Sequence, residues 1–324
     1  MRHMQNFIKW FTKLYPVWII GSSVLGLVKP EALNWFSGPW VVWGLAIVMV
    51  GMGLTLTLDD FRQLFRMPRW LALGFVAHYT IMPLSGWLIS RVLQLEPGLA
   101  VGLILVASCP SGTASNVICF LARANVALAV MITLTSTLMA FVMTPLWTQT
   151  LAGRYVPVDG WQLSLTTLQV VVLPVLIGVF CNWRFPKTVA KIAPYGPLIS
   201  VAALIFIAGS IVAQGADAVM ANAGKLLVAA LLLHLMGFLF GYLVARLLRY
   251  PVQVARTVAI EVGMQNGGMA AVLARKNFPD PMTAVPAVFS SVVQTVVGSL
   301  VAGWWRARPV AGATPDESEN HPGH

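Results

Sequence analysis

The chain has 324 residues, of which 58% are hydrophobic and only 10% are charged. An average soluble domain carries about 25% charged residues, so this composition excludes an ordinary soluble protein and indicates a membrane protein. The net charge of +10 does not by itself indicate a nucleic-acid partner, because the positions of the basic residues follow a membrane topology.

Apolar segments close to the ~20 residues needed to cross a bilayer recur along the whole chain. We predict ten of them, called spans one to ten, at residues 14–30, 38–57, 69–91, 97–122, 126–149, 161–182, 193–213, 224–245, 254–274 and 283–305. The predicted fold is therefore an all-α membrane protein with one domain over residues 1–306. Residues 307–324 are polar and contain Pro and Gly, which predicts a disordered tail.

The basic residues predict how the spans are oriented. If the chain starts in the cytoplasm, fifteen of its 21 Lys and Arg residues fall in cytoplasmic segments and the other six fall in outer segments. Membrane proteins keep an excess of Lys and Arg on the cytoplasmic side, so both termini and the tail are predicted to be cytoplasmic. The acidic partner of these residues is then membrane lipid, and we expect no nucleic-acid partner.

Glu261 is the only acidic residue that falls inside a predicted span rather than in a loop or the tail. An ionisable group within hydrocarbon costs at least ~2.5 kcal/mol, so its presence there indicates a function. It is followed by Gly263, Gln265, Asn266 and Gly267, residues that loosen a helix and supply oxygen ligands. This combination predicts a cation site in a broken transmembrane helix.

Spans four and nine resemble each other. Span four contains CPSGTASNVICFLAR, ending at Arg123, and span nine contains EVGMQNGGMAAVLAR, ending at Arg275, 152 residues later. Ten spans divide into two sets of five that enter the membrane from opposite sides, and inverted repeats with helices interrupted at matching positions are typical of secondary transporters. The alternative is that the small residues only allow close helix packing.

The candidate cation ligands come from three spans. Span four supplies the side chains of Ser115 and Asn116, and span five supplies Thr133 and Thr137, which are four residues apart and share a helix face. Span nine adds Glu261, backbone carbonyls near Val262 and Met264, and the amide of Gln265. A buried carboxylate among hydroxyl and amide oxygens suits Na⁺, although Ser and Thr hydroxyls within spans often bond to their own helix instead.

A substrate site is predicted where each broken helix starts again. Those positions are Thr113-Ala114 and Asn266-Gly267. A helix N-terminus has free N–H groups and the positive end of the helix dipole, which suits the carboxylate of an organic anion. No Lys or Arg lies in the middle of a span to hold the anion by a buried ion pair.

Four segments together resemble the bile acid:sodium symporter family, in its bacterial branch: GMGLTLTLDDF (51–61), SGTASNVICFLAR (111–123), NVALAVMITLTSTL (125–138) and AIEVGMQNGGMAA (259–271). The resemblance covers the chain apart from its tail. It implies a multi-pass protein of the bacterial inner membrane, with a panel of spans 1, 2, 6 and 7 and a core of spans 3–5 and 8–10. In the core, spans four and nine are expected to be broken and to cross.

The resemblance also implies two sodium sites. The first would use Ser115, Asn116, Thr133, Thr137 and Glu261, and the second would use Glu261, Val262, Met264 and Gln265. Family members often carry Gln in span three as a ligand of the second ion, and this chain has His78 there. Neutral imidazole is a poorer Na⁺ ligand than an amide oxygen. His78 is therefore a weak ligand, a proton-coupling group or a hydrogen-bonded interior histidine.

These residues predict sodium-coupled symport of an organic anion, either a small hydroxy or keto acid of the pantoate type or a bile-acid-like molecule. One alternative is proton-coupled transport of the anion through Glu261 and His78, and another is a passive channel. An enzyme is not expected, because the His and Cys residues show neither metal-ligand spacing nor a nucleophile–base pair.

Overall fold

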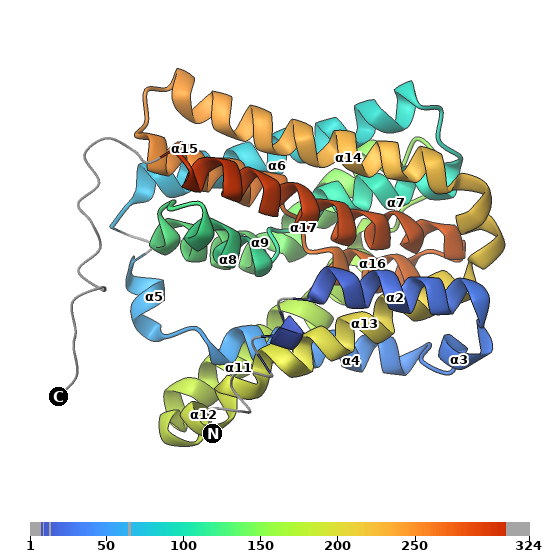
Figure 1. Ribbon diagram of the computed structural model, residues 1–324, viewed down its shortest axis with the longest axis horizontal. Helices are drawn as coiled ribbons and strands as arrows, with labels where there is room; N and C mark the ends of the chain where they lie inside the picture. The colour runs from blue at the N-terminus through green and yellow to red at the C-terminus, as the bar shows by residue number, and fades with distance from the viewer. Residues whose placement is uncertain (1–7, 9, 13, 64–65, 309–324) are drawn as a thin grey trace.

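The computed structural model describes residues 8, 10–12, 14–63 and 66–308 (Figure 1). Within these ranges every regular element is a helix, and the only β-type pairing is an isolated bridge between Ser111 and Gln265. The longer elements, in chain order, are α2 (Tyr15–Val28), α4 (Pro39–Leu54), α6 (Pro68–Val92), α7 (Pro97–Ser108), α8 (Ala114–Leu121), α9 (Val126–Ala152), α10 (Gly160–Thr167), α11 (Leu173–Arg184), α13 (Gly196–Gln214), α14 (Ala216–Leu247), α15 (Val252–Gly263), α16 (Gly267–Asn277) and α17 (Val285–Arg306). The shorter ones are α3 (Glu31–Asn34), α5 (Leu58–Gln63), η1 (Leu168–Val172), α12 (Pro186–Ile192), η2 (Ala193–Tyr195) and η3 (Pro281–Ala284).

The helices have the length and composition of membrane spans. Six helical stretches of the described chain are long and apolar enough to cross a membrane, at Pro68–Val92, Val126–Ala152, Gly160–Arg184, Pro186–Gln214, Val219–Leu247 and Pro281–Arg306. Three more apolar helices, α2, α4 and α7, are shorter. The prediction of an all-α membrane protein is therefore confirmed. Most of the predicted tail, residues 309–324, lies outside the described residues.

Local sequence signals fix where several helices begin. Pro is the first residue of α4, α6 and α7, where its missing N–H costs no helical hydrogen bond. Asn125 and Asp159 cap α9 and α10, because each side-chain oxygen accepts a backbone N–H three residues later. The stretch from α10 to α11 continues through one π-helical turn that ends beside Pro174, whose ring removes a donor from the regular ladder.

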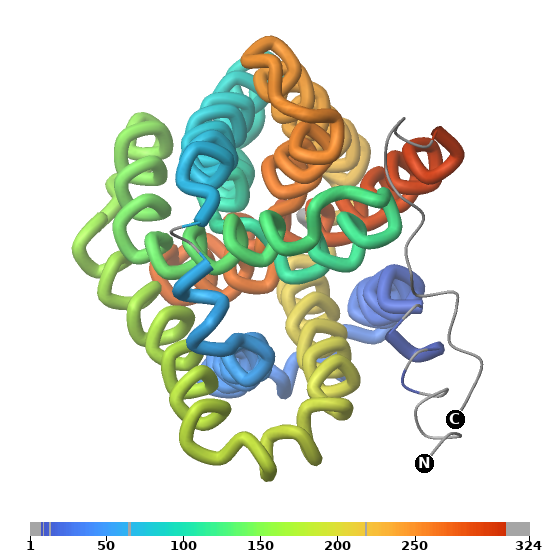
Figure 2. The backbone as a smooth tube through the Cα atoms, turned by 90° about the vertical axis from the view of Figure 1, so that its left-hand side faces the viewer, coloured from blue at the N-terminus to red at the C-terminus, as the bar shows by residue number. Residues whose placement is uncertain are grey.

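Two helical segments are interrupted, and the interruptions lie against each other near the centre of the bundle. Residues 109–113 separate α7 from α8, and residues 264–266 separate α15 from α16. In the end-on view of Figure 2, the green segment that includes α8 runs across the middle of the molecule. The Asn266 N–H donates to the Pro110 carbonyl (2.8 Å) and the Gly112 N–H to the Met264 carbonyl (3.2 Å). A Cβ at Gly112 would lie 2.7 Å from the carbonyl oxygen of Gln265, so this approach needs glycine.

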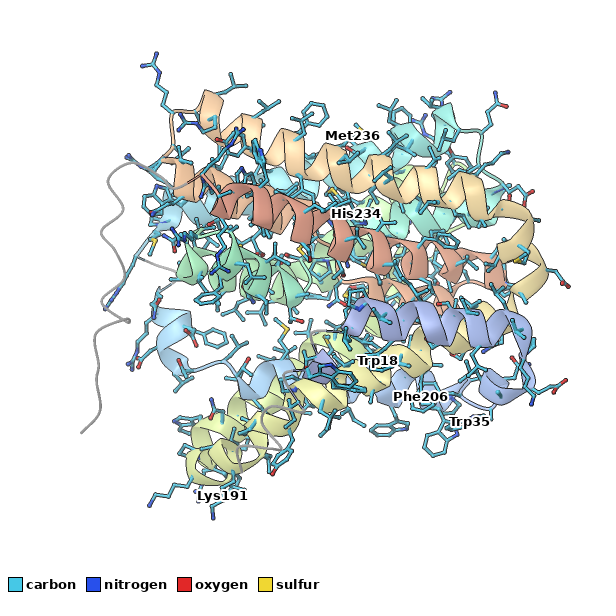
Figure 3. The ribbon with its side chains drawn as sticks, in the orientation of Figure 1. Trp18, Trp35, Lys191, Phe206, His234 and Met236 are labelled. Atoms are coloured by element: carbon cyan, nitrogen blue, oxygen red, sulfur yellow. The ribbon has the colours of Figure 1, made fainter. Side chains whose placement is uncertain are left out.

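Outside the crossing, the helices pack in two groups. In the first group, α13 packs on α2 and α4, and α4 packs on α11; Trp35, after α3, lies 5.8 Å from Phe206 of α13 between ring centroids (Figure 3). In the second group, α6 packs on α7, α9 and α14, and α14 packs on α15 and α17. The two half-helices that follow the breaks differ: α16 contacts α4 and α13 of the first group, whereas α8 packs on α9, α15 and α17 of the second (Figure 1).

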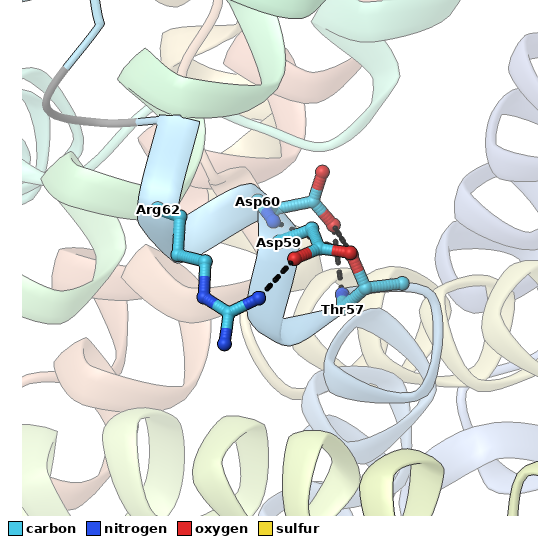
Figure 4. A network of polar contacts seen from close by, with 4 residues as sticks. All are labelled: Thr57, Asp59, Asp60 and Arg62. Carbon is cyan, nitrogen blue, oxygen red and sulfur yellow. Dashed lines mark hydrogen bonds and ion pairs between the residues drawn. The ribbon is translucent and has the colours of Figure 1, made fainter.

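The short helix α5 connects the two groups at the surface and folds through its own side chains (Figure 4). Asp60 Oδ2 accepts from both the N–H (2.7 Å) and the hydroxyl (2.8 Å) of Thr57, which caps the helix. Arg62 pairs with Asp59 at 2.7 Å, but both side chains are more than 70% exposed. An ion pair this exposed adds little stability, so the cap is what fixes this helix locally.

Candidate functional site

Glu261 lies at the centre of the crossing, two residues before α15 ends, and is fully buried. Its carboxylate accepts the Ser115 hydroxyl from α8 at Oε1 (2.5 Å) and the Thr133 hydroxyl from α9 at Oε2 (2.8 Å). The Cys119 thiol is 4.0 Å from Oε1 and adds at most a weak contact. In the described part of the chain no Lys or Arg pairs with this carboxylate. A buried carboxylate without a counter-ion is costly, and a bound cation would neutralise it.

Two further predicted ligands carry oxygens that have no hydrogen-bond partner. These are Asn116 Oδ1, one residue after Ser115, and Thr137 Oγ1, one helical turn after Thr133. Buried polar atoms are nearly always paired, so unpaired oxygens adjacent in helix position to Ser115 and Thr133 are candidates for ion ligands. The hydroxyls of Ser115 and Thr133 are also only 3.5 Å apart. Ser115 and Thr133 therefore bring two hydroxyls to the Glu261 carboxylate, and these are hard oxygen donors of the kind that Na⁺ prefers.

The residues predicted for a second ion are arranged differently, because their backbone carbonyls are already bonded. The Val262 carbonyl accepts from Gln265 Nε2 (3.1 Å), and the Met264 carbonyl accepts from the Gly112 N–H (3.2 Å). The Glu261 carbonyl is 2.9 Å from His78 Nδ1. At this position the one buried acceptor without a partner is Gln265 Oε1.

The side chain of His78, on α6, contacts both helix breaks. Its Nδ1 faces the Glu261 carbonyl in α15, and its Nε2 faces the Cys109 carbonyl after α7, each at 2.9 Å. The side chain is fully buried. Both ring nitrogens face carbonyl oxygens, and a neutral imidazole has one N–H, so it donates to one of the two carbonyls. This is the geometry of a hydrogen-bonded interior histidine that fixes the spacing of the two broken helices.

Two side chains outside the predicted set also hold the break. His234, midway along α14 (Figure 3), has Nδ1 2.8 Å from the Gly263 carbonyl and Nε2 2.8 Å from the Ser290 hydroxyl. Gln294 of α17 accepts the Gln265 N–H (2.6 Å) and donates to the Gln265 carbonyl (2.9 Å), as a neighbouring strand would. An uncharged amide in an apolar span is the signal that identifies Gln294, since a buried amide needs partners of this kind.

The predicted substrate residues lie at the starts of the two half-helices. Thr113 and Ala114 are exposed at the start of α8. The Asn266 side-chain oxygen caps α16 by accepting the Met269 N–H (3.0 Å), so its NH₂ group is the part free to donate to an anion. Gly267 is buried, and a Cβ there would collide with the Ser291 hydroxyl.

The cavity beside Gly267 is small. Between α2, α13, α16 and α17 it holds about 10 Å³, room for about one water molecule. The start of α16 is therefore closed to an organic anion in this conformation, whereas the start of α8 is accessible.

Comparisons with known proteins identify the family. A probable chloroplastic sodium/metabolite cotransporter, BASS1 of Arabidopsis thaliana, is 47% identical over 292 residues, covering 90% of this chain and 73% of that protein. The sodium-dependent transporter YocS of Bacillus subtilis is 40% identical over 292 residues, covering 90% of each. The probable cotransporter BASS2 of Oryza sativa is 39% identical over 313 residues, covering 97% of this chain and 75% of that protein. These relatives are transporters rather than enzymes.

The family model agrees over more than half of the sequence. Residues 42–222 match the model of the sodium bile acid symporter family. This range contains α4, α8 and α9, with the Ser115 and Thr133 hydroxyls that bond Glu261. The chain is therefore a multi-pass membrane transporter that belongs to the sodium bile acid symporter family.

Proposed function

We propose that the protein is a secondary active transporter that couples the entry of an organic anion to the entry of sodium. The observation that carries the proposal is the uncompensated carboxylate of Glu261, buried among the hydroxyls of Ser115 and Thr133 and near the unpaired oxygens of Asn116 and Thr137. Sodium binding at these oxygens would neutralise the carboxylate and hold α8, α9 and α15 together. The names of the relatives, which are sodium-dependent or sodium/metabolite transporters, support sodium as the coupling ion.

The proposed architecture has ten transmembrane spans in two inverted sets of five, with both termini in the cytoplasm of a bacterium and the protein in its inner membrane. In it, α2, α4, α10–α11 and α13 form a panel, and the remaining spans form a core. Alternating access is then a rocking of the core against the panel about the crossing. The exposed start of α8 and the enclosed start of α16 support this, because a rocking motion opens one side while it closes the other.

The proposed cargo is an organic anion whose carboxylate docks between the starts of α8 and α16. Thr113 and Ala114 offer the N-terminus of α8, and Asn266 and Gly267 offer that of α16. These N–H groups and the Asn266 NH₂ are donors, which suits an anion and not a cation. The candidates are a small hydroxy or keto acid of the pantoate type and a bile-acid-like molecule, and direct competition for uptake would distinguish them.

The test is the thermal stability of the purified protein in Na⁺ against equimolar K⁺, with Glu261→Gln as the comparison. For a dissociation constant of about 10 mM, about 100 mM Na⁺ adds about 1.4 kcal/mol to the free energy of unfolding. We expect this Na⁺-specific gain in the wild type and its loss in Glu261→Gln. An equal response of the wild type to both ions would refute the sodium site.

Proton coupling through Glu261 and His78 is the main alternative. Uptake of the anion into vesicles that follows a pH gradient and ignores Na⁺ would favour it. A passive channel would not concentrate the anion, so uptake against the anion's concentration gradient would exclude a channel.

A further inference from the structure

We propose that the crossing binds one sodium ion, at the Glu261 carboxylate, and that His78 occupies the place where a second ion would bind. The inference rests on the proposed function, because it assumes that the Glu261 cluster is a sodium site. Beyond the proposed function, it specifies the number of sodium ions transported with each anion and identifies His78 as the residue that sets this number.

The break between α15 and α16 exposes backbone acceptors that a continuous helix would pair. A helix that unwinds releases carbonyl oxygens, and in a membrane each of them must find another partner. If protein donors satisfy them, an ion gains little by replacing those donors. If they are unpaired, they form a ready cation site.

Protein donors satisfy the carbonyls of residues 262 to 265, and the Glu261 carbonyl faces a ring nitrogen of His78. The partners, in chain order, are His78 Nδ1 (2.9 Å), Gln265 Nε2 (3.1 Å), His234 Nδ1 (2.8 Å), the Gly112 N–H (3.2 Å) and Gln294 Nε2 (2.9 Å). In the facing break, the Pro110 carbonyl accepts the Asn266 N–H (2.8 Å), and the Cys109 carbonyl lies 2.9 Å from His78 Nε2. The single N–H of a neutral His78 serves either the Cys109 or the Glu261 carbonyl. Four consecutive carbonyls, from Val262 to Gln265, thus have their own protein donors without an ion.

The residues predicted to bind the first ion differ, because some of their oxygens have no hydrogen-bond partner. Asn116 Oδ1 and Thr137 Oγ1, beside Ser115 and one turn after Thr133, have no partner, and within the described residues no Lys or Arg pairs with the carboxylate. On the His78 side the one unpaired buried oxygen is Gln265 Oε1. A hard cation takes several oxygen ligands, so a single free oxygen does not make a second site.

His78 explains why the two sides differ. Its ring lies between the carbonyls of Cys109 and Glu261, so it fills the gap between the breaks with nitrogens and carbon rather than oxygens. A glutamine in its place has an amide oxygen for an ion and an NH₂ group that still donates to a carbonyl. One sodium with one monovalent anion moves no net charge, so uptake of such an anion by the wild type is expected to be independent of membrane potential.

The experiment is equilibrium binding of radioactive sodium to the purified wild type, His78→Gln and His234→Gln, with Glu261→Gln as the reference for non-specific binding. We expect one saturable ion per wild-type protein and twice that number in His78→Gln. His234→Gln is the matched control, because His234 is equally buried and also faces a carbonyl of the break, yet it lies on α14 and bonds Ser290. It is expected to keep one ion.

The outcomes separate the inference from the proposed function. Two ions per wild-type protein would overturn the inference and leave the sodium site standing. No binding above the Glu261→Gln reference would remove both. A folded His78→Gln variant that still binds one ion would overturn the role of His78. If that variant does not fold, the wild-type count alone decides the number of ions.

Discussion

Glu261 owes its position to hydroxyl groups from two other helices, so sodium affinity is expected to depend on single side-chain oxygens. Thr133→Val keeps the shape of the side chain and removes the group that bonds Glu261 Oε2. Hydrogen bonds to charged groups contribute about 1.5–3 kcal/mol, and about 1.4 kcal/mol is a tenfold change in affinity. We expect the half-saturating Na⁺ concentration, read from thermal stability, to rise about tenfold or more.

The control for this change is Thr167→Val. Thr167 is also buried, but its hydroxyl bonds the Leu163 carbonyl of its own helix. Its Na⁺ response should match that of the wild type. Equal half-saturation in Thr133→Val and Thr167→Val would contradict the assignment of Thr133 as a ligand.

The sequence identifies charged residues of the site better than neutral ones. Glu261 is conspicuous because its cost in hydrocarbon is large and its neighbours are apolar. Gln294 and His234 carry only the weaker signal of an uncharged polar residue in a span, and such a residue is usually satisfied inside the bundle. Their partners, Gln265 and Gly263, are each 29 residues away in sequence, and only the packing of α17 and α14 on α15 brings them together.

At the scale of the elements, the crossing depends on close approach of two backbones. A Cβ added at Gly112 would lie 2.7 Å from the Gln265 carbonyl oxygen, and the flanking Gly112–Met264 hydrogen bond prevents the backbones from separating freely. Overpacking of this kind costs about 1–3 kcal/mol. We expect Gly112→Ala to lower the melting temperature and to abolish the Na⁺-specific gain.

Gly224→Ala, in α14, is the matched substitution. A Cβ at Gly224 meets no atom within 4 Å, so the melting temperature should stay the same or rise slightly. A Gly112→Ala protein with wild-type stability and Na⁺ response would show that the crossing tolerates wider spacing.

The breaks themselves were predictable from local residues, whereas their crossing was expected only from the family resemblance. Pro110, Gly112 and the polar residues after them mark the first interruption, and Gly263 to Gly268 mark the second, because these residues disfavour a continuous helix. The pairing of Ser111 with Gln265 is a tertiary contact. No local pattern encodes which oxygens remain unpaired after that contact forms.

For the whole molecule, the difference between the two half-helices predicts how access changes. The side chain of Val117 on α8 is 61% exposed, and that of Ala271 on α16 is 3% exposed. With Cys181 replaced by Ala, we expect a water-soluble maleimide to label Val117→Cys rapidly and Ala271→Cys slowly. Under alternating access, any condition that protects residue 117 should expose residue 271.

Changes of the two labelling rates in the same direction would contradict a rocking motion, and constant rates in all conditions would indicate a fixed pore. The sequence could not predict which side is open, because one sequence must stabilise both conformations to nearly the same extent. The all-helical membrane fold, in contrast, follows from composition and span length alone.

The distance in sequence between Glu261 and its partners also has a consequence for synthesis. Ser115 and Glu261 are 146 residues apart, and Thr133 and Glu261 are 128 apart. At about 5–20 residues per second, a ribosome needs about 7–30 seconds to add those 146 residues. During that interval the hydroxyls of the first half are in the membrane without their carboxylate. The sodium site is thus completed late in biogenesis, when the second half of the chain inserts and joins the first.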